Sequence, residues 1–171
     1  MANGKDNLPH TNLCEMGGEH SMNLPNGVTG FYRAEDSEPR SLNGKQFKQL
    51  CFDFVSRIRG RVISISPPQY PANFYCAQVE ISKELIYILL NEHYPYLTFA
   101  SSVELGDIKF IDVPALHALF DSFYQVTGTA VLNTSVDQSS LLKLELNSAE
   151  LEQIAYWKPE TIGQIIFNHW D

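Results

Sequence analysis

Residues 75–112 decide the fold, and they read YCAQVEISKELIYILLNEHYPYLTFASSVELGDIKFID. In the first seven residues, Tyr75, Ala77, Val79 and Ile81 alternate with Cys76, Gln78 and Glu80. This alternation predicts a strand with one face toward a core. Residues 85–90 are apolar on both faces, so we expect that strand at the centre of a sheet. Turn residues then separate two further predicted strands, 96–101 and 108–112. Turns this short favour an antiparallel meander over crossover connections.

Helical patterns flank this stretch on both sides. Before it, apolar residues recur at helical spacing and predict a helix that ends at Gly60, with Asn43 as its N-cap. They form one apolar stripe: Phe47, Leu50, Cys51, Phe54, Val55 and Ile58. A β-branched strand is predicted over 62–65. After the stretch, Pro114 opens a second helix, whose apolar side is formed by Leu116, Leu119, Phe120 and Phe123.

The carboxy-terminal part predicts one more strand and further helices. Leu142, Leu144 and Leu146 alternate with polar residues, which predicts a strand, and Asn147 with Glu150 forms a capping-box pattern. A helix restarts after Pro159, and the closing residues, WKPETIGQIIFNHWD (157–171), are distinctive without naming a family. The order of elements predicts an α+β fold with a mainly antiparallel sheet of about five to six strands and helices packed on one face.

The length of 171 residues suits one domain. We expect residues 1–30 to form a flexible amino-terminal arm and residues 31–171 to form a single α+β domain. An alternative is that the arm packs on its own domain, since it holds five apolar residues, Leu8, Leu13, Met16, Met22 and Leu24.

The composition predicts a cytoplasmic protein. We find no secretory pattern and no run of about 18 apolar residues that would cross a membrane. Three unpatterned cysteines, Cys14, Cys51 and Cys76, fit a reducing compartment.

Charge is unevenly distributed along the chain. The net charge is −8, and residues 67–171 carry four Lys against thirteen Asp or Glu, a balance of −9. This field would repel phosphate backbones, so we expect neither nucleic acid nor membrane as a partner. A basic protein partner, such as a toxin, is the expected complement.

Catalytic and metal-binding patterns are weak. The set His10, Cys14, Glu15, Glu19 and His20 has the residue types of a zinc site, but its spacing matches no structural zinc pattern, so we expect no metal and no cofactor. No nucleophile elbow or phosphate-binding loop occurs in the sequence. Three other candidates are a general base at His93, a nucleophilic thiol at Cys51 and an anion site at Arg57, Arg59 and Arg61. Each has a simpler explanation: His93 as an exposed turn residue, Cys51 as a core residue, and the arginines as helix capping and surface charge.

The predicted partner-binding residues lie at two turns of the meander, Glu92, Tyr94 and Tyr96 at the first and Glu104 and Asp107 at the second. The tyrosines are expected to be exposed because prolines and turns surround them. The leading hypothesis is a non-catalytic cytoplasmic protein-binding domain that masks a basic partner, of the immunity-protein or antitoxin kind. One alternative is an enzyme with an unrecognised carboxylate or His site at one end of the sheet. Another is a small-ligand binding or oligomeric structural domain.

Overall fold

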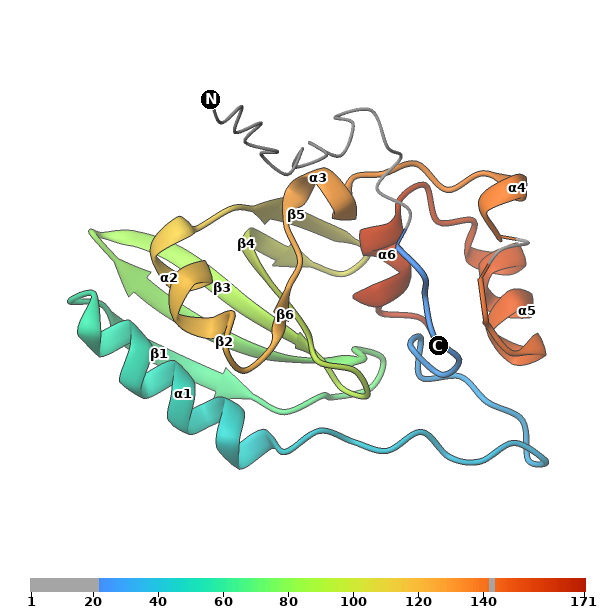
Figure 1. Ribbon diagram of the computed structural model, residues 1–171, viewed down its shortest axis with the longest axis horizontal. Coiled ribbons are helices and arrows are strands. Elements are labelled where there is room, and N and C mark those ends of the chain that lie inside the picture. The colour runs from blue at the N-terminus through green and yellow to red at the C-terminus, as the bar shows by residue number, and fades with distance from the viewer. Residues whose placement is uncertain (1–21, 142–143) are drawn as a thin grey trace, which may run out of the picture.

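The computed structural model describes residues 22–141 and 144–171, and its centre is a six-stranded sheet (Figure 1). Five strands form an antiparallel meander in chain order: β1 (Arg61–Ser66), β2 (Phe74–Ile81), β3 (Glu84–Asn91), β4 (Tyr96–Glu104) and β5 (Asp107–Ile111). A two-residue strand, β6 (Gln125–Val126), pairs in parallel with the start of β4. The predicted α+β fold with a mainly antiparallel sheet is therefore confirmed.

The first face of the sheet is covered by two helices, α1 (Gly44–Arg57) and α2 (Pro114–Phe120) (Figure 1). The Asn43 side chain accepts hydrogen bonds from the first backbone N–H groups of α1, as the sequence predicts. The apolar stripe of α1 packs on alternate residues of the central strands. This forms the first core, which includes Phe47, Cys51, Phe54, Val55, Ile88, Leu90, Leu97, Phe99, Leu116 and Phe120.

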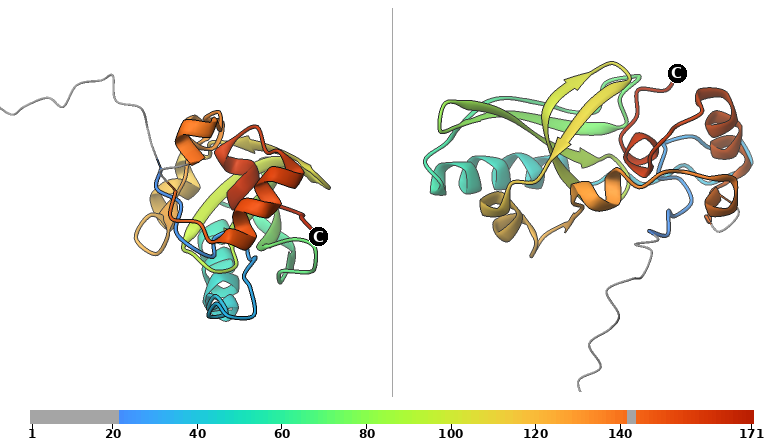
Figure 2. Two further views of the ribbon diagram at one scale, coloured as in Figure 1. Left: turned by 90° about the vertical axis from the view of Figure 1, so that its right-hand side faces the viewer. Right: turned by 90° about the horizontal axis from the view of Figure 1, so that it is seen from above.

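The second face carries a layer built from both ends of the described chain (Figure 2). Its short helices are α3 (Thr129–Leu132), α4 (Gln138–Leu141), α5 (Ser148–Trp157) and α6 (Ile162–Ile166). Together with residues 22–31 they form the second core over one end of the sheet. Its buried members include Leu24, Val28, Phe74, Leu89, Leu132, Ile154, Ile165, Ile166 and Phe167.

Residues 22–30, which belong to the predicted arm, therefore lie against the domain. Leu24 and Val28 are fully buried, and Thr29 is 1% exposed. This packing supports the alternative in which the arm packs on its own domain, for the part of the arm from Met22 onward. Residues 1–21 lie outside the described residues, and the flexibility of the arm stays a prediction.

Two details of the predicted elements are wrong. Residues 144–147 form no strand, and Leu142 lies outside the described residues; Leu144 and Leu146 instead pack on the second core as irregular chain leading to α5. An alternating pattern of leucines does not show whether the edge of a sheet has free backbone groups with which a further strand could pair. Phe123 lies beyond the end of α2 and is 50% exposed. No helix in the described residues is long and apolar enough to span a membrane.

Candidate binding pocket

A pocket of about 470 Å³ lies between the carboxy-terminal residues and the β4–β5 hairpin. Its residues come from three parts of the chain: Pro71, Leu105, Gly106, Ile108, Phe110, Trp157, Lys158, Pro159, Glu160, Gln164, Phe167, Asn168, His169, Trp170 and Asp171. The closing stretch that is distinctive in sequence thus supplies most of the lining. A volume of this size falls within the usual range of ligand pockets.

The wall formed by the β4–β5 hairpin depends on an irregularity in β4. The first part of β4 pairs with β3, and the pairing of β4 with β5 shifts register between Ala100 and Ser102. A bulge of this kind bends a strand and increases its twist. The hairpin therefore reaches over the second face, and Figure 2 (right) shows its tip near the carboxy-terminal chain. Gly106 makes the tight turn at that tip, with a φ of +75°.

The opposite wall begins where α5 ends. Lys158 adopts the left-handed conformation, with a φ of +53°, and Pro159 follows it, so the helix cannot continue. Hydrogen bonds with the segment after α3 then hold this chain: Val136 donates to the Glu160 carbonyl at 2.9 Å, and Ile162 donates to the Thr134 carbonyl at 3.0 Å. The pocket wall at 158–160 is consequently fixed at both ends.

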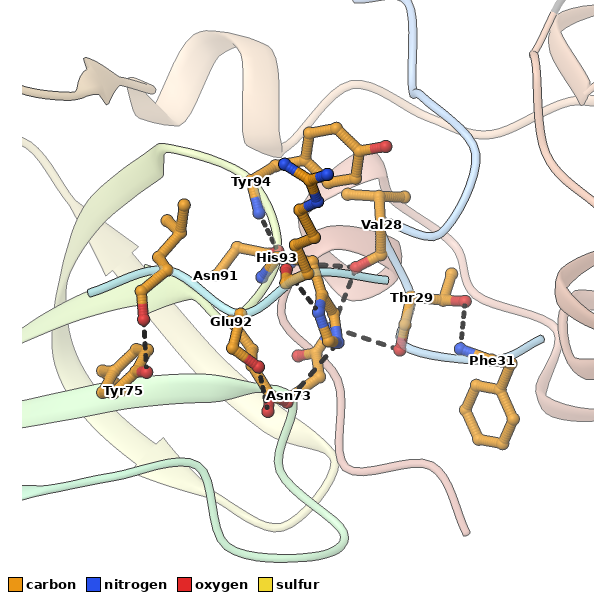
Figure 3. A network of polar contacts seen from close by, with 12 residues as sticks. Val28, Thr29, Phe31, Asn73, Tyr75, Asn91, Glu92, His93 and Tyr94 are labelled. Atoms are coloured by element: carbon orange, nitrogen blue, oxygen red, sulfur yellow. Dashed lines mark hydrogen bonds and ion pairs between the residues drawn. The ribbon is translucent and has the colours of Figure 1, made fainter. Parts of the chain in front are cut away.

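Three buried asparagines attach the carboxy-terminal chain to the end of the sheet. The Asn73 amide donates to the carbonyls of Val28, Thr29 and Ile166 at 3.0–3.3 Å, and its oxygen accepts from the Asn168 backbone N–H at 2.8 Å. Asn91 donates to the Val28 and Ile166 carbonyls at 3.0 and 2.7 Å. Figure 3 shows Asn73 and Asn91 converging on Val28. These bonds satisfy backbone groups that burial would otherwise leave unpaired.

Glu150 connects the amino-terminal segment to α5. It is fully buried, and its carboxylate accepts four hydrogen bonds at 2.7–3.0 Å, from the backbone N–H groups of Gly27, Thr29 and Asn147 and from the Thr29 hydroxyl. The predicted capping box is confirmed. It does more than cap a helix, because the same carboxylate fixes the loop at residues 27–29.

The rim of the pocket combines exposed apolar side chains with unpaired charge. Leu105 is 76% exposed and Trp157 is 38% exposed, and Tyr70, beside the lining residue Pro71, is 81% exposed. Glu160 and Asp171 are exposed, and within the described chain no ion pair involves either of them or Lys158.

His169 is the one imidazole among the lining residues. Its ring packs edge-on against Phe74, with the ring centroids 5.1 Å apart. Burial lowers the pKa of His169 below its usual value, so the ring is neutral at physiological pH.

The predicted partner-binding residues are divided between two environments. Glu104 and Asp107 are exposed and flank Leu105 and Gly106 at the pocket rim, where they lie opposite each other across the hairpin. The expectation that Tyr96 is exposed is wrong: it is 8% exposed because it begins β4 with its ring toward the second core, stacked against Tyr94. Tyr94 is partly buried, and its hydroxyl donates to the Asn26 carbonyl.

Glu92 and His93 take part in local contacts at the first turn. The Glu92 carboxylate lies 3.4 Å from the Ser41 hydroxyl and 3.5 Å from the His93 ring, and the His93 Nδ1 lies 3.1 Å from the Arg40 carbonyl (Figure 3). The His93 side chain is only 9% exposed. These contacts hold the segment before α1 against the β3–β4 turn.

Among the remaining sequence candidates, the two described cysteines are unreactive, and Arg57 and Arg61 have carboxylate partners. Burial raises the pKa of the Cys51 thiol strongly and that of Cys76 to about 11, so both thiols are protonated at neutral pH. Arg57 bonds to Asp53, and Arg61 bonds to Glu80. No group of three or more metal-ligating side chains occurs in residues 22–141 and 144–171, and the set from His10 to His20 lies outside those residues.

The pocket residues themselves were not predicted from the sequence. Trp157, Lys158, Glu160 and His169 match no motif, and their grouping depends on the bend in β4 and on the hydrogen bonds of Asn168. The available signal was the dense set of aromatic and charged residues in the closing stretch. No protein-family model matches this chain, and no curated protein or solved structure matches it.

Proposed function

We propose that this chain is a non-catalytic protein-binding domain that masks a basic protein partner, of the immunity-protein or antitoxin kind, and that the carboxy-terminal pocket and its rim form the contact surface. One observation carries this proposal. Exposed apolar side chains at the rim, Leu105 and Trp157, lie beside carboxylates without ion-pair partners. Protein interfaces commonly combine a few aromatic or aliphatic contacts with a polar, charged rim.

Charge at the hairpin tip supports a cationic partner. Glu104 and Asp107 are opposite each other in the register of β4 and β5. Like charges placed directly opposite across a strand pair repel each other. A cation from a partner would relieve this repulsion, and the −9 balance of residues 67–171 would accelerate its approach.

The chemistry of the lining favours binding over nucleophilic catalysis. The lining holds no Ser, Thr or Cys side chain. Its imidazole packs against Phe74, and burial disfavours the protonated form. The arrangement therefore offers contact area and charge but no hydroxyl or thiol nucleophile next to a base.

The test compares charge reversal at the rim with charge reversal elsewhere. Immobilised wild-type protein is used for a pull-down from the native host, beside Glu104→Lys/Asp107→Lys and a control, Glu35→Lys/Glu84→Lys. The control changes the net charge equally at exposed residues that are neither in the pocket lining nor adjacent in sequence to a lining residue. We expect the wild type and the control to retain one basic protein that the rim variant loses.

Kinetics with the purified partner complete the test. We expect association with wild-type protein to slow as salt rises, and the rim variant to lose most of that dependence. Glu92→Lys in the same assay examines the first turn, where the exposed parts of Glu92 and Tyr94 are the alternative contact region. Equal capture by all variants, or salt-independent association, would contradict the proposal.

A further inference from the structure

We infer that the pocket receives an arginine side chain of the basic partner, with the guanidinium between the indole of Trp157 and the carboxylates of Glu160 and Asp171. This inference rests on the proposed function and specifies the chemistry that the site recognises. It concerns one side chain of the partner held in the pocket, whereas the proposed function depends on the whole contact surface and on overall charge.

The position of Trp157 suits a cationic, planar group. Its indole N–H already donates to the Gln153 side chain at 3.1 Å, so the ring is oriented from within α5. Tyr156 packs edge-on against it, at 5.2 Å between centroids. Trp157 is nevertheless 38% exposed and lines the pocket, which leaves surface of the residue for a ligand. Guanidinium groups stack on such surfaces and are attracted by the ring electrons.

The carboxylates supply the directional part of the recognition. Glu160 and Asp171 both line the pocket, and no salt bridge within the described chain neutralises them. A planar guanidinium can donate two parallel hydrogen bonds to one carboxylate, which an ammonium group cannot do. The apolar lining, which includes Leu105 and Phe110, would cover the aliphatic part of the arginine side chain.

Lys158 opposes this binding and gives the inference a sharp test. Its ammonium is the one Lys or Arg charge among the lining residues, and it would repel a guanidinium. Because the backbone at Lys158 is left-handed, asparagine is the replacement that removes the charge and tolerates the conformation. We therefore expect Lys158→Asn to strengthen arginine binding, although it replaces a long side chain of the site by a shorter one.

The experiment uses a blocked Gly-Arg-Gly peptide as the probe and the indole N–H signals in nuclear magnetic resonance as the readout. The chain has two tryptophans, Trp157 and Trp170, and both line the pocket, so both signals come from residues of this site. Trp157→Phe assigns them. We expect a saturable shift with the arginine peptide, and binding weaker by about tenfold or more when citrulline, the neutral analogue, replaces arginine.

Variants then separate the contributions of the pocket. Glu160→Gln/Asp171→Asn should sharply reduce the preference for arginine over citrulline, leaving the part that the Trp157 ring supplies. Lys158→Asn should increase affinity for arginine, and Glu35→Gln/Glu84→Gln should change neither quantity. The absence of a saturable shift, or equal binding of arginine and citrulline, would overturn the inference. The Glu104→Lys/Asp107→Lys variant could still lose the partner in the pull-down when the peptide shows no arginine-specific binding. In that case the proposed function would stand, and the inference that the pocket receives an arginine would be wrong.

Discussion

Glu150 shows how one side chain can fix two distant segments. Its carboxylate is fully buried, and its four hydrogen bonds come from three backbone N–H groups and a hydroxyl. Backbone donors at residues 27 and 29 have no alternative acceptor once the second core has closed over them. The residue therefore stabilises the loop that carries Val28, and Val28 in turn offers its carbonyl to Asn73 and Asn91.

Replacing this carboxylate by an amide should be costly. Glu150→Gln presents an NH₂ group to donors that need an acceptor, so we expect a loss of about 3 kcal/mol of unfolding free energy. Glu152→Gln is the matched control, since Glu152 lies on the same helix, is 66% exposed and pairs with Arg33 at the surface; its cost should be below about 1 kcal/mol. Urea denaturation monitored by circular dichroism measures both. Equal costs would show that the Glu150 bonds contribute little.

At the scale of elements, the sequence predicted what depends on local pattern. The α1 stripe, the Asn43 cap, the Asn147–Glu150 capping box and the meander all follow from spacing and turn residues. The predicted strand is absent at 144–147, because an alternating sequence pattern does not show whether the edge of a sheet is free to pair with it. The pocket was not predictable for a related reason: its walls meet only through a register shift in β4 and long-range hydrogen bonds such as Asn168 to Asn73.

The face of α1 can be tested with two phenylalanines of the same helix. Phe54 is 4% exposed and packs edge-on against Phe120 at 4.9 Å, whereas Phe52 is 49% exposed. We expect Phe54→Ala to cost about 3–5 kcal/mol of unfolding free energy and Phe52→Ala to cost under about 1 kcal/mol. Chemical denaturation of both variants gives the comparison. The reverse order would mean that the helix is rotated relative to the sheet.

At the scale of the whole molecule, two cores share one sheet. The central strand β3 directs Ile88 and Leu90 into the first core and Leu89 into the second. A strand that supports both cores cannot separate from one without disturbing the other. We therefore expect the two cores to unfold together.

Two variants test this coupling. Leu24→Ala removes a fully buried side chain from the second core, and Phe54→Ala removes one from the first. Each variant should unfold in a single urea transition with a lower midpoint than the wild type. Tryptophan fluorescence reports on the carboxy-terminal pocket, and far-ultraviolet circular dichroism reports on the sheet. We expect both probes to give the same midpoint. Two separated midpoints in either variant would indicate independent units.

The bonds of the second core have a consequence for how the protein is made. Glu150 contacts residues more than a hundred positions earlier, and Asn168 bonds to Thr29, 139 positions away. A ribosome releases the chain from its amino end, so the strands and helices up to β6 emerge while the loop at residues 27–29 still lacks Glu150 and Asn168. We expect stalled nascent chains to gain protease resistance over α1 and the meander first. Resistance at residues 22–31 should appear only when the closing stretch has left the exit tunnel.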